Sequence, residues 1–273
     1  MDITTKWKLN NGVEIPVLGL GTYLSKPGKE TYEAVRYALD IGYRHIDTAA
    51  LYANEEDVGK AVRDSGVPRE EIFVTTKVWN SDQGYDTTIN AFYKSLKKLK
   101  FDYIDLYLIH WPQPKTRIDT WRALIQLYDD KKASSIGVSN YTIRHMEEVL
   151  HGSPFKPLVN QIEFSPYLYQ KDILSYCNRR NIIVEAYTPL VRGKKFKDPK
   201  LVELAEKYSK TPAQIMIRWA LQVGTVVLPK SIHPERIKEN ADIFDFEISE
   251  DDMLLMEDFN ENYRVAWDPT KIE

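Results

Sequence analysis

The sequence predicts an α/β fold, a (β/α)8 barrel of the TIM type with an N-terminal β-hairpin that closes its bottom. Short strand-like runs alternate with amphipathic helical stretches, and this alternation is typical of βαβ units with a parallel sheet. Eight such runs are present, and eight βα units close most simply into a barrel. The 273 residues fit the roughly 200–250 residues that a barrel usually takes. We therefore expect one domain over residues 1–273.

The expected elements follow in chain order. The strands are Ile15–Gly21, His45–Ala49, Phe73–Val78, Ile104–His110, Ser134–Asn140, Val159–Ser165, Ile182–Leu190 and Val226–Ser231. The helices are Glu30–Ile41, Glu55–Ser65, Tyr85–Leu99, Asp119–Lys131, Ile143–Leu150, Lys171–Arg180 and Pro212–Val223. In the first helix, Tyr32, Val35 and Leu39 share one stripe, as a helix packed on a sheet requires. The turn signal Asn10-Asn11-Gly12 lies between two short apolar runs and predicts the hairpin.

The structural alternative is a doubly wound open sheet. That fold predicts a glycine-rich turn after an early strand, and Gly19-Leu20-Gly21 is the candidate. No third glycine follows at the required spacing. The pair therefore indicates a tight strand exit, and the barrel is favoured.

Composition narrows the class of protein further. The chain has 37 basic and 40 acidic side chains and a net charge of −3, which gives no support to nucleic-acid binding. One cysteine cannot form an internal disulfide or a cysteine-rich zinc motif. The mean hydropathy is −0.44, and no run approaches the roughly 20 apolar residues of a membrane helix. With no signal-peptide pattern at the N-terminus, we expect a soluble cytoplasmic protein.

Polar side chains end three neighbouring strands of the expected barrel. The second strand leads to Asp47, with Tyr52 just beyond it, the third ends at Lys77 and the fourth at His110. Active residues of barrels lie at the carboxyl ends of strands, so we expect these four side chains to meet at one rim. An ordinary rim ion pair beside a packing aromatic is the structural alternative, but burying charges without a function is costly.

The chain resembles the aldo-keto reductases over essentially its whole length, and the four residues just named are part of the resemblance. The motifs that carry the resemblance are Leu18-Gly19-Leu20-Gly21-Thr22, Gly42-Tyr43-Arg44-His45-Ile46-Asp47-Thr48-Ala49 with Tyr52, Thr76-Lys77-Val78-Trp79, Leu108-Ile109-His110-Trp111-Pro112, Ile136-Gly137-Val138-Ser139-Asn140, Asn160-Gln161-Ile162-Glu163 and Leu228-Pro229-Lys230-Ser231. The resemblance implies that Asp47, Tyr52, Lys77 and His110 form the catalytic tetrad. It is closest to the prokaryotic branch that reduces diketo-sugars, glyoxals and small aldehydes.

The chemistry explains these residue types. Reduction of a carbonyl with a nicotinamide needs a hydride at carbon and a proton at oxygen. Tyr52 can supply the proton, and we expect the Lys77 ammonium to lower the tyrosine pKa from its usual value of about 10. Asp47 would fix Lys77, and His110 would orient the carbonyl. In reverse, the Tyr52 phenolate would act as a base.

The resemblance implies NADPH, favoured over NADH, as the cofactor. Pro234 suits the first turn of a helix after the last strand, and such a helix N-terminus is a phosphate site. Ser139, Asn140 and Gln161 offer donors and acceptors to the nicotinamide carboxamide, and Tyr187 would stack on its ring. The full set of expected cofactor residues is Gly21, Thr22, Tyr23, Asp47, Ser139, Asn140, Gln161, Tyr187, Thr188, Pro189, Leu190, Lys230, Ser231, His233, Arg236, Glu239 and Asn240.

The expected substrate is a small carbonyl, dicarbonyl or keto-sugar. Tyr23, Trp79 and Trp111 lie just past strand ends and would form an aromatic wall beside Tyr52 and His110. The segment Trp111–Trp121, the loop after Leu190 and the residues after Asn260 are short for this family. These short elements predict an open pocket.

Two other function classes stay open from the residues alone. A metal-dependent barrel hydrolase could use His45, Asp47 and His110, although the His-x-His pattern is absent. A nucleotide-binding sensor is the non-enzymatic alternative, and the intact tetrad argues against it. We expect no metal, no nucleic-acid partner, no membrane association and a monomer. The Tyr167…Lys171 spacing resembles a short-chain dehydrogenase pair but lacks the glycine-rich turn, and Cys177 is expected to be buried rather than nucleophilic.

Overall fold

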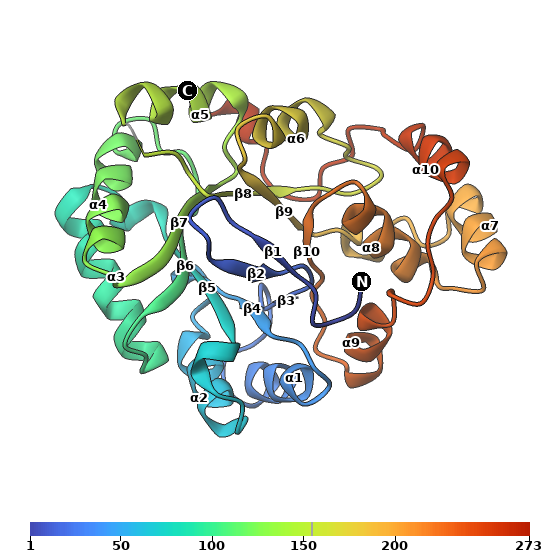
Figure 1. The fold of residues 1–273 in the computed structure, drawn as a ribbon, viewed down its shortest axis with the longest axis horizontal. Coiled ribbons are helices and arrows are strands. Elements are labelled where there is room, and N and C mark those ends of the chain that lie inside the picture. The colour runs from blue at the N-terminus through green and yellow to red at the C-terminus, as the bar shows by residue number, and fades with distance from the viewer. Residues whose placement is uncertain (154) are drawn as a thin grey trace.

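The computed structural model describes residues 1–153 and 155–273, and it contains the expected eight-stranded parallel barrel (Figure 1). The strands follow the order β10-β9-β8-β7-β6-β5-β4-β3. The two end strands meet through parallel bridges from Leu18 to Val227 and from Gly21 to Lys230, and the Gly19 amide donates to the Val227 carbonyl. The sheet is therefore closed, as the alternation of elements predicts.

Six of the eight barrel strands end earlier than expected, whereas β3 and β5 end at the expected residues. Their bounds are β3 (Leu20–Gly21), β4 (His45–Asp47), β5 (Phe73–Val78), β6 (Ile104–Ile109), β7 (Ala133–Ser139), β8 (Val159–Glu163), β9 (Ile183–Tyr187) and β10 (Val226–Leu228). Residues such as His110 and Asn140 leave the hydrogen-bonded ladder and form the rim. The expected first strand is wrong at its start, because Ile15 and Pro16 belong to the hairpin; the barrel strand itself is Leu20–Gly21, and Leu18 joins β10 through an isolated bridge.

The hairpin forms as the turn signal predicts. Strands β1 (Lys6–Lys8) and β2 (Glu14–Pro16) pair antiparallel with Trp7 opposite Ile15. Figure 1 shows this hairpin lying across the amino-terminal end of the barrel. Its apolar side chains pack into the barrel interior, in a cluster of Leu9, Ile15, Phe73, Leu106, Leu108, Leu158, Val159 and Val226. The hairpin thus closes the bottom and leaves the opposite end for chemistry.

Helices surround the barrel. Their bounds are α1 (Lys29–Asp40), α2 (Glu55–Asp64), α3 (Tyr85–Leu99), α4 (Arg117–Asp129), α5 (Ile143–Gly152), α6 (Lys171–Asn178), α7 (Pro199–Lys207), α8 (Pro212–Gln222), α9 (Pro234–Ala241) and α10 (Glu250–Glu257). The sequence interpretation omitted α7 and α10, although each carries a start signal. The Asp198 side chain caps α7 and the Ser249 side chain caps α10.

The Gly19 position shows why the lone Gly-x-Gly pair is structural. A Cβ atom at Gly19 would lie 2.8 Å from the His45 ring, which is closer than two carbon atoms can approach. The missing side chain lets His45 sit inside the barrel, fully buried. Among the residues that the structure describes, no helix combines the length and the apolar character needed to cross a membrane.

Candidate active site

A buried ion pair joins the second and third barrel strands at the rim. The Lys77 ammonium donates to both Asp47 carboxylate oxygens, at 2.8 and 2.7 Å, and to the Thr48 carbonyl at 2.9 Å. Lys77 is fully buried and Asp47 nearly so. Adjacent parallel strands bring these two strand ends together. A buried charge needs such a partner, because leaving it alone in the interior would cost several kcal/mol.

Tyr52 lies above this pair on a single 3₁₀ turn, Ala50–Tyr52. The Lys77 nitrogen is 5.2 Å from the centre of the Tyr52 ring, and the ring centres of Tyr52 and His110 are 5.7 Å apart. The structure therefore brings all four expected catalytic side chains together.

Asn54 holds the loop that carries Tyr52, and the sequence interpretation missed it. The fully buried Asn54 amide accepts a hydrogen bond from the Thr48 hydroxyl at 2.7 Å and donates to the Thr22 carbonyl at 3.1 Å. These bonds tie both sides of the loop to the first two barrel strands. A polar amide two residues beyond Tyr52 was the available signal.

The expected effect of Lys77 on Tyr52 is absent from this structure. Burial is the main cause that raises the Tyr52 pKa well above its usual 10, and the Asp47 charge adds to it. All three Lys77 donors are taken by Asp47 and Thr48, so none reaches the phenol. Tyr52 is therefore protonated at neutral pH, which is the state that a proton donor requires.

His110 is a neutral imidazole at the end of β6. Burial, and to a lesser extent the Lys77 charge, holds the His110 pKa well below its ordinary range. Its ring packs edge-on against Tyr52 and Trp79, while its carbonyl accepts from the Asn140 amide at 3.0 Å. A neutral ring in this position can donate one hydrogen bond to a substrate oxygen without delivering a charge.

The residues expected to bind nicotinamide gather beside this tetrad. The Ser139 hydroxyl donates to the Gln161 carbonyl at 2.9 Å, and the Tyr187 hydroxyl donates to Asn140 Oδ1 at 2.7 Å. Asn140 and Thr188 have φ angles of 63° and 51°, in the left-handed region that non-glycine residues rarely adopt. Such strain persists where the surrounding structure enforces it, and it clusters at ligand sites.

The residues expected to bind the adenine end lie around the start of α9. His233 is the N-cap and Pro234 the first helical residue, as expected, and the His233 amide donates to the Ser231 hydroxyl. Lys230 and Arg236 are exposed, and within residues 1–153 and 155–273 neither has an ion-pair partner. Both cations therefore remain available for an anion.

The other two residues expected near the adenine are Glu239 and Asn240. The Glu239 carboxylate accepts a hydrogen bond from the Thr211 hydroxyl at 2.5 Å, so it already supports the start of α8. Asn240 is buried on the last turn of α9. Gly21, Thr22, Pro189 and Leu190 lie on the strand ends and loops between this region and the tetrad.

The aromatic wall contains one member that the sequence interpretation missed. Trp267 packs against Trp111 and Trp79, with ring centres 5.5 and 6.2 Å away. Trp79 in turn contacts His110, and Tyr23 contacts Tyr52 with ring centres 5.0 Å apart. The tail thus places an exposed indole on this side, and the open pocket expected from the short tail stays a prediction.

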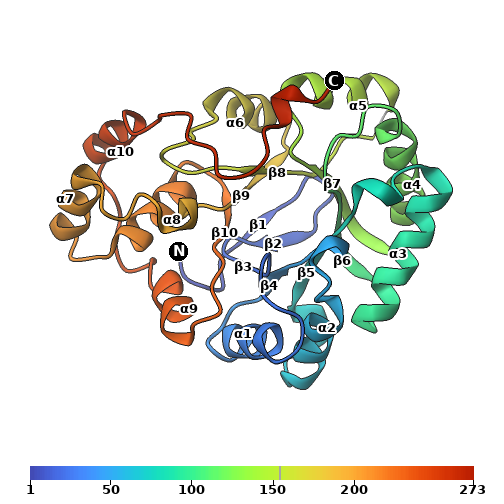
Figure 2. The same cartoon turned by 180° about the vertical axis from the view of Figure 1, so that it is seen from behind.

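Residues 261–273 cross the carboxyl end of the barrel from α10 to the vicinity of α5 (Figure 2). The Glu163 carboxylate at the end of β8 accepts from the backbone amides of Val265 and Ala266, at 2.6 and 3.3 Å. Near the end of this segment, His145 Nε2 donates to the Ile272 carbonyl at 3.0 Å. The segment is thus fixed on both sides of Trp267. These contacts link residues more than a hundred positions apart, so local sequence patterns carry no signal of them.

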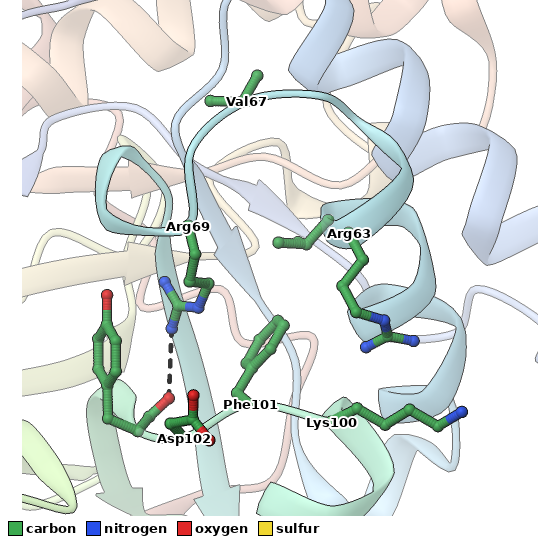
Figure 3. A pocket seen from close by; sticks show the side chains of 8 residues that line it. Arg63, Val67, Arg69, Lys100, Phe101 and Asp102 are labelled. Carbon is green, nitrogen blue, oxygen red and sulfur yellow. Dashed lines mark hydrogen bonds between the residues drawn. The ribbon is translucent and has the colours of Figure 1, made fainter.

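A recess of about 310 Å³ lies between the end of α2 and the α3–β6 connection (Figure 3). Arg69 fills one side. It donates to the Asp105 carboxylate at 2.5 Å and to the Tyr103 carbonyl at 3.4 Å, and it lies over the Phe101 ring. Arg63 donates to the Leu99 carbonyl. The guanidinium groups of Arg63 and Arg69 are therefore already bonded within the fold, where they link α2, α3 and β6. We assign no ligand to this recess.

A barrel whose rim joins a buried Lys–Asp pair, a protonated tyrosine and a neutral histidine defines a carbonyl-reducing barrel enzyme. Residues 17–261 match the Aldo/keto reductase family, and the chain belongs to this family. It is an aldo-keto reductase, an oxidoreductase, rather than a metal-dependent hydrolase.

Individual relatives support the same assignment. The chain is 51% identical to a glyoxal reductase of Bacillus subtilis (strain 168), over 97% of this chain and 96% of the relative. It is 42% identical to the methylglyoxal reductase DkgA of Escherichia coli (strain K12), over 96% of each chain. A solved structure of a Gox0644 mutant in complex with NADPH superimposes with a TM-score of 0.93, at 41% identity and over 98% of both chains.

Proposed function

We propose that this protein reduces small aldehydes and dicarbonyls, of the glyoxal type, to alcohols with NADPH, and that Tyr52 is the proton donor. The observation that carries the proposal is the convergence of Tyr52, the buried Lys77–Asp47 pair and neutral His110 at one rim. The relatives' names support the substrate class, since two of them are reductases of glyoxal and methylglyoxal.

The residues at the rim fit NADPH. The polar side chains of Ser139, Asn140 and Gln161 match the donors and acceptor of a carboxamide. The exposed Lys230 and Arg236 beside the α9 N-terminus match a phosphate.

Each residue of the tetrad has a distinct task in this proposal. NADPH, when bound, supplies the hydride that the carbonyl carbon accepts. Tyr52 gives its hydroxyl proton to the carbonyl oxygen, and His110 donates a hydrogen bond that orients this oxygen. The Lys77 charge stabilises the phenolate that Tyr52 becomes, and Asp47 keeps the ammonium in place. The products are the alcohol and the oxidised cofactor.

The substrate side is walled by aromatic rings. Tyr23, Trp79, Trp111 and the exposed Trp267 surround the place of the carbonyl. Flat apolar walls with a few polar groups are typical of small-molecule sites. They exclude water around a small, planar dicarbonyl and leave the polar contacts to Tyr52 and His110.

The whole site is built from one chain, and we propose that the protein acts as a monomer. We also propose a cytoplasmic location, since cells keep the reduced cofactor inside. Size-exclusion chromatography checks the first proposal, and fractionation of the source cells checks the second.

The Tyr52→Phe variant tests the function. Turnover of methylglyoxal, followed by the loss of NADPH absorbance, should fall by at least about a thousandfold, in line with general acid catalysis. NADPH affinity, measured by tryptophan fluorescence quenching, should stay within about twofold because the hydroxyl does not hold the cofactor. Turnover near that of the unaltered protein would remove Tyr52 from the mechanism. If the unaltered protein binds NADPH but reduces no carbonyl in a panel of substrates, the result would favour a nucleotide sensor over an enzyme.

A further inference from the structure

The side-chain amide of Gln161 is held between two carboxyl groups inside the barrel. Gln161 Nε2 lies 2.9 Å from Asp47 Oδ2 and 2.9 Å from Glu185 Oε2. All three side chains are buried. If the amide were turned over, its oxygen would face two carboxyl oxygens, so the flanking groups fix which amide atom is the nitrogen.

The amide then has one group left for a ligand. Its two N–H bonds are directed to Asp47 and Glu185, and Oε1 has no hydrogen-bond partner within the described part of the chain. Oε1 is also not among the enclosed polar atoms that lack partners. Gln161 can therefore offer only an acceptor at the rim.

Glu185 is a buried carboxyl group that the reaction itself does not use. It lies at the middle of β9, where a charged residue interrupts an otherwise apolar strand. Burial, helped by the Asp47 charge, raises the Glu185 pKa to about 8, against smaller opposing effects of Gln161 and Lys77. Glu185 is thus mainly protonated at neutral pH, and Asp47 is the carboxylate beside Gln161 that pairs with Lys77.

The neighbour of Glu185 on the other side is suited to a protonated carboxyl. His45 Nε2 lies 3.6 Å from Glu185 Oε1. Burial lowers the His45 pKa to about 3, so the ring is neutral. Its Nδ1 lies 3.4 Å from the Pro16 carbonyl and must carry the proton, so Nε2 accepts from the Thr75 hydroxyl at 3.1 Å. Glu185 Oε1 has no hydrogen-bond partner among the described residues, whereas Oε2 accepts from Gln161 Nε2.

We propose that Glu185 is a positioning residue for the cofactor: by accepting the second amide proton of Gln161, it turns Oε1 toward the cofactor and makes the site select a ring substituent that carries an N–H donor. This inference rests on the proposed function, in which Gln161 faces the nicotinamide carboxamide. Asp47 contributes the other acceptor, so the catalytic ion pair and the cofactor contact share one amide.

The 3-acetylpyridine analogue of NADPH probes this contact directly. The analogue keeps the carbonyl of the carboxamide but has a methyl group in place of its NH2 group. Against Gln161 Oε1 it leaves a buried acceptor without a donor, so the protein should bind NADPH about tenfold more tightly than the analogue. The ratio of the two dissociation constants is measured by tryptophan fluorescence quenching and does not depend on turnover.

Two variants at one position separate the hydrogen bond from packing. Glu185→Gln keeps an acceptor at the Oε2 position and should keep the roughly tenfold preference. Glu185→Met has similar size but no strong acceptor, so Gln161 keeps only the bond to Asp47 and its amide is less firmly oriented; the preference should fall to about threefold or less. Affinity for 2′-phospho-ADP-ribose, which lacks the nicotinamide, should be the same in all three proteins and shows that the variants are folded. An unchanged preference in Glu185→Met would overturn the proposal.

A Gln161→Leu variant separates this inference from the proposed function. If the unaltered protein shows no preference for NADPH, or if Gln161→Leu keeps it, then Gln161 does not face the carboxamide, and both the placement of the cofactor and the role of Glu185 fail. If Gln161→Leu loses the preference while Glu185→Met keeps it, the cofactor placement stands and the role of Glu185 alone is refuted.

Discussion

The Lys77 ammonium has three N–H bonds, and Asp47 and Thr48 accept all of them. This arrangement stabilises two charges where water cannot reach them. In the proposed mechanism Lys77 therefore acts on the Tyr52 phenolate through its electric field, at 5.2 Å from the ring centre, rather than through a hydrogen bond. A residue in this position contributes to folding and to catalysis at once, and a suitable pair of variants can separate the two.

The Lys77→Met variant should lose both turnover and stability. Removing the cation leaves Asp47 buried without its partner, which should lower the free energy of unfolding by about 3–5 kcal/mol. Adding Asp47→Asn removes the stranded charge, so the double variant should recover most of that stability in urea unfolding. Turnover should stay negligible in both, because the phenolate of Tyr52 has no cation beside it. Recovery of turnover in the double variant would contradict the role of Lys77.

We propose that coenzyme choice depends on Arg236. It is exposed near the start of α9, where a guanidinium can bind a 2′-phosphate with two hydrogen bonds. Arg236→Ala should weaken NADPH by about ten- to hundredfold and leave NADH nearly unchanged. Lys238→Ala, which removes an exposed cation two residues further along the same helix, is the matched control. Equal weakening of both coenzymes by Arg236→Ala would show that Arg236 supports the loop instead.

At the scale of elements, α2 and α3 pack so closely that one position must be glycine. A Cβ atom at Gly59 would lie 2.1 Å from the Leu99 carbonyl oxygen at the end of α3. That oxygen also accepts from Arg63 on α2, so the end of one helix is fixed against the side of the other. Here the helix uses glycine despite its low helix propensity.

Gly59→Ala should therefore destabilise the fold, although alanine favours a helix. The overlap forces α2 and α3 apart, and overpacking of this kind costs about 1–3 kcal/mol or more. Gly152→Ala is the control, since a Cβ atom at this end of α5 meets nothing closer than 3.7 Å. That change should be neutral or stabilising by up to about 1 kcal/mol. Urea unfolding of the two variants gives the comparison, and similar effects would rule out the steric explanation.

Much of the element order could be predicted because local sequence patterns determine it. The turn signal at Asn10-Asn11-Gly12 predicts the hairpin, and Tyr85–Leu99 has its observed bounds in the helical pattern. Six of the eight strand ends were placed too far along the chain, since the rim residues continue the strand pattern after the ladder has ended. The helices α7 and α10 were missed because their segments are short and only their caps identify them.

The site was predictable to the extent that strand ends and motifs define it. Asp47, Lys77 and His110 follow from the rule for barrel rims, and the structure brings them together with Tyr52. Trp267 could not be predicted, because its place depends on contacts of the tail with a strand a hundred residues earlier. The direction of the Tyr52 pKa was wrong, because burial outweighs a nearby cation.

At the scale of the whole molecule, closure of the barrel determines which groups can ionise. Hairpin residues seal one end, and the interior above them contains His45, Glu185, Gln161 and the Asp47–Lys77 pair. Water does not reach these groups, so burial holds His45 neutral and keeps Glu185 protonated at neutral pH. The stability of the fold must then depend on pH through them, with opposite signs.

The sign for each group follows from proton counting. Below about pH 6.5 the unfolded chain binds a proton at histidine that folded His45 does not, so the His45 contribution to stability declines as the pH falls toward 3. Between pH 4.5 and about 8, folded Glu185 keeps a proton that the unfolded chain has released. Stability from Glu185 is therefore fully present below pH 4.5 and is lost as the pH rises through about 8.

Glu185→Gln isolates the second effect. The variant cannot lose a proton at this position, while His45 is the same in both proteins and cancels from the comparison. The melting temperature of Glu185→Gln minus that of the unaltered protein should therefore rise steadily from pH 5 toward pH 8, whatever its value at pH 5. Differential scanning calorimetry at several pH values in one ionic strength measures this slope. A difference that stays constant over this range would show that folded Glu185 is already ionised, and a difference that falls would show that ionised Glu185 stabilises the barrel.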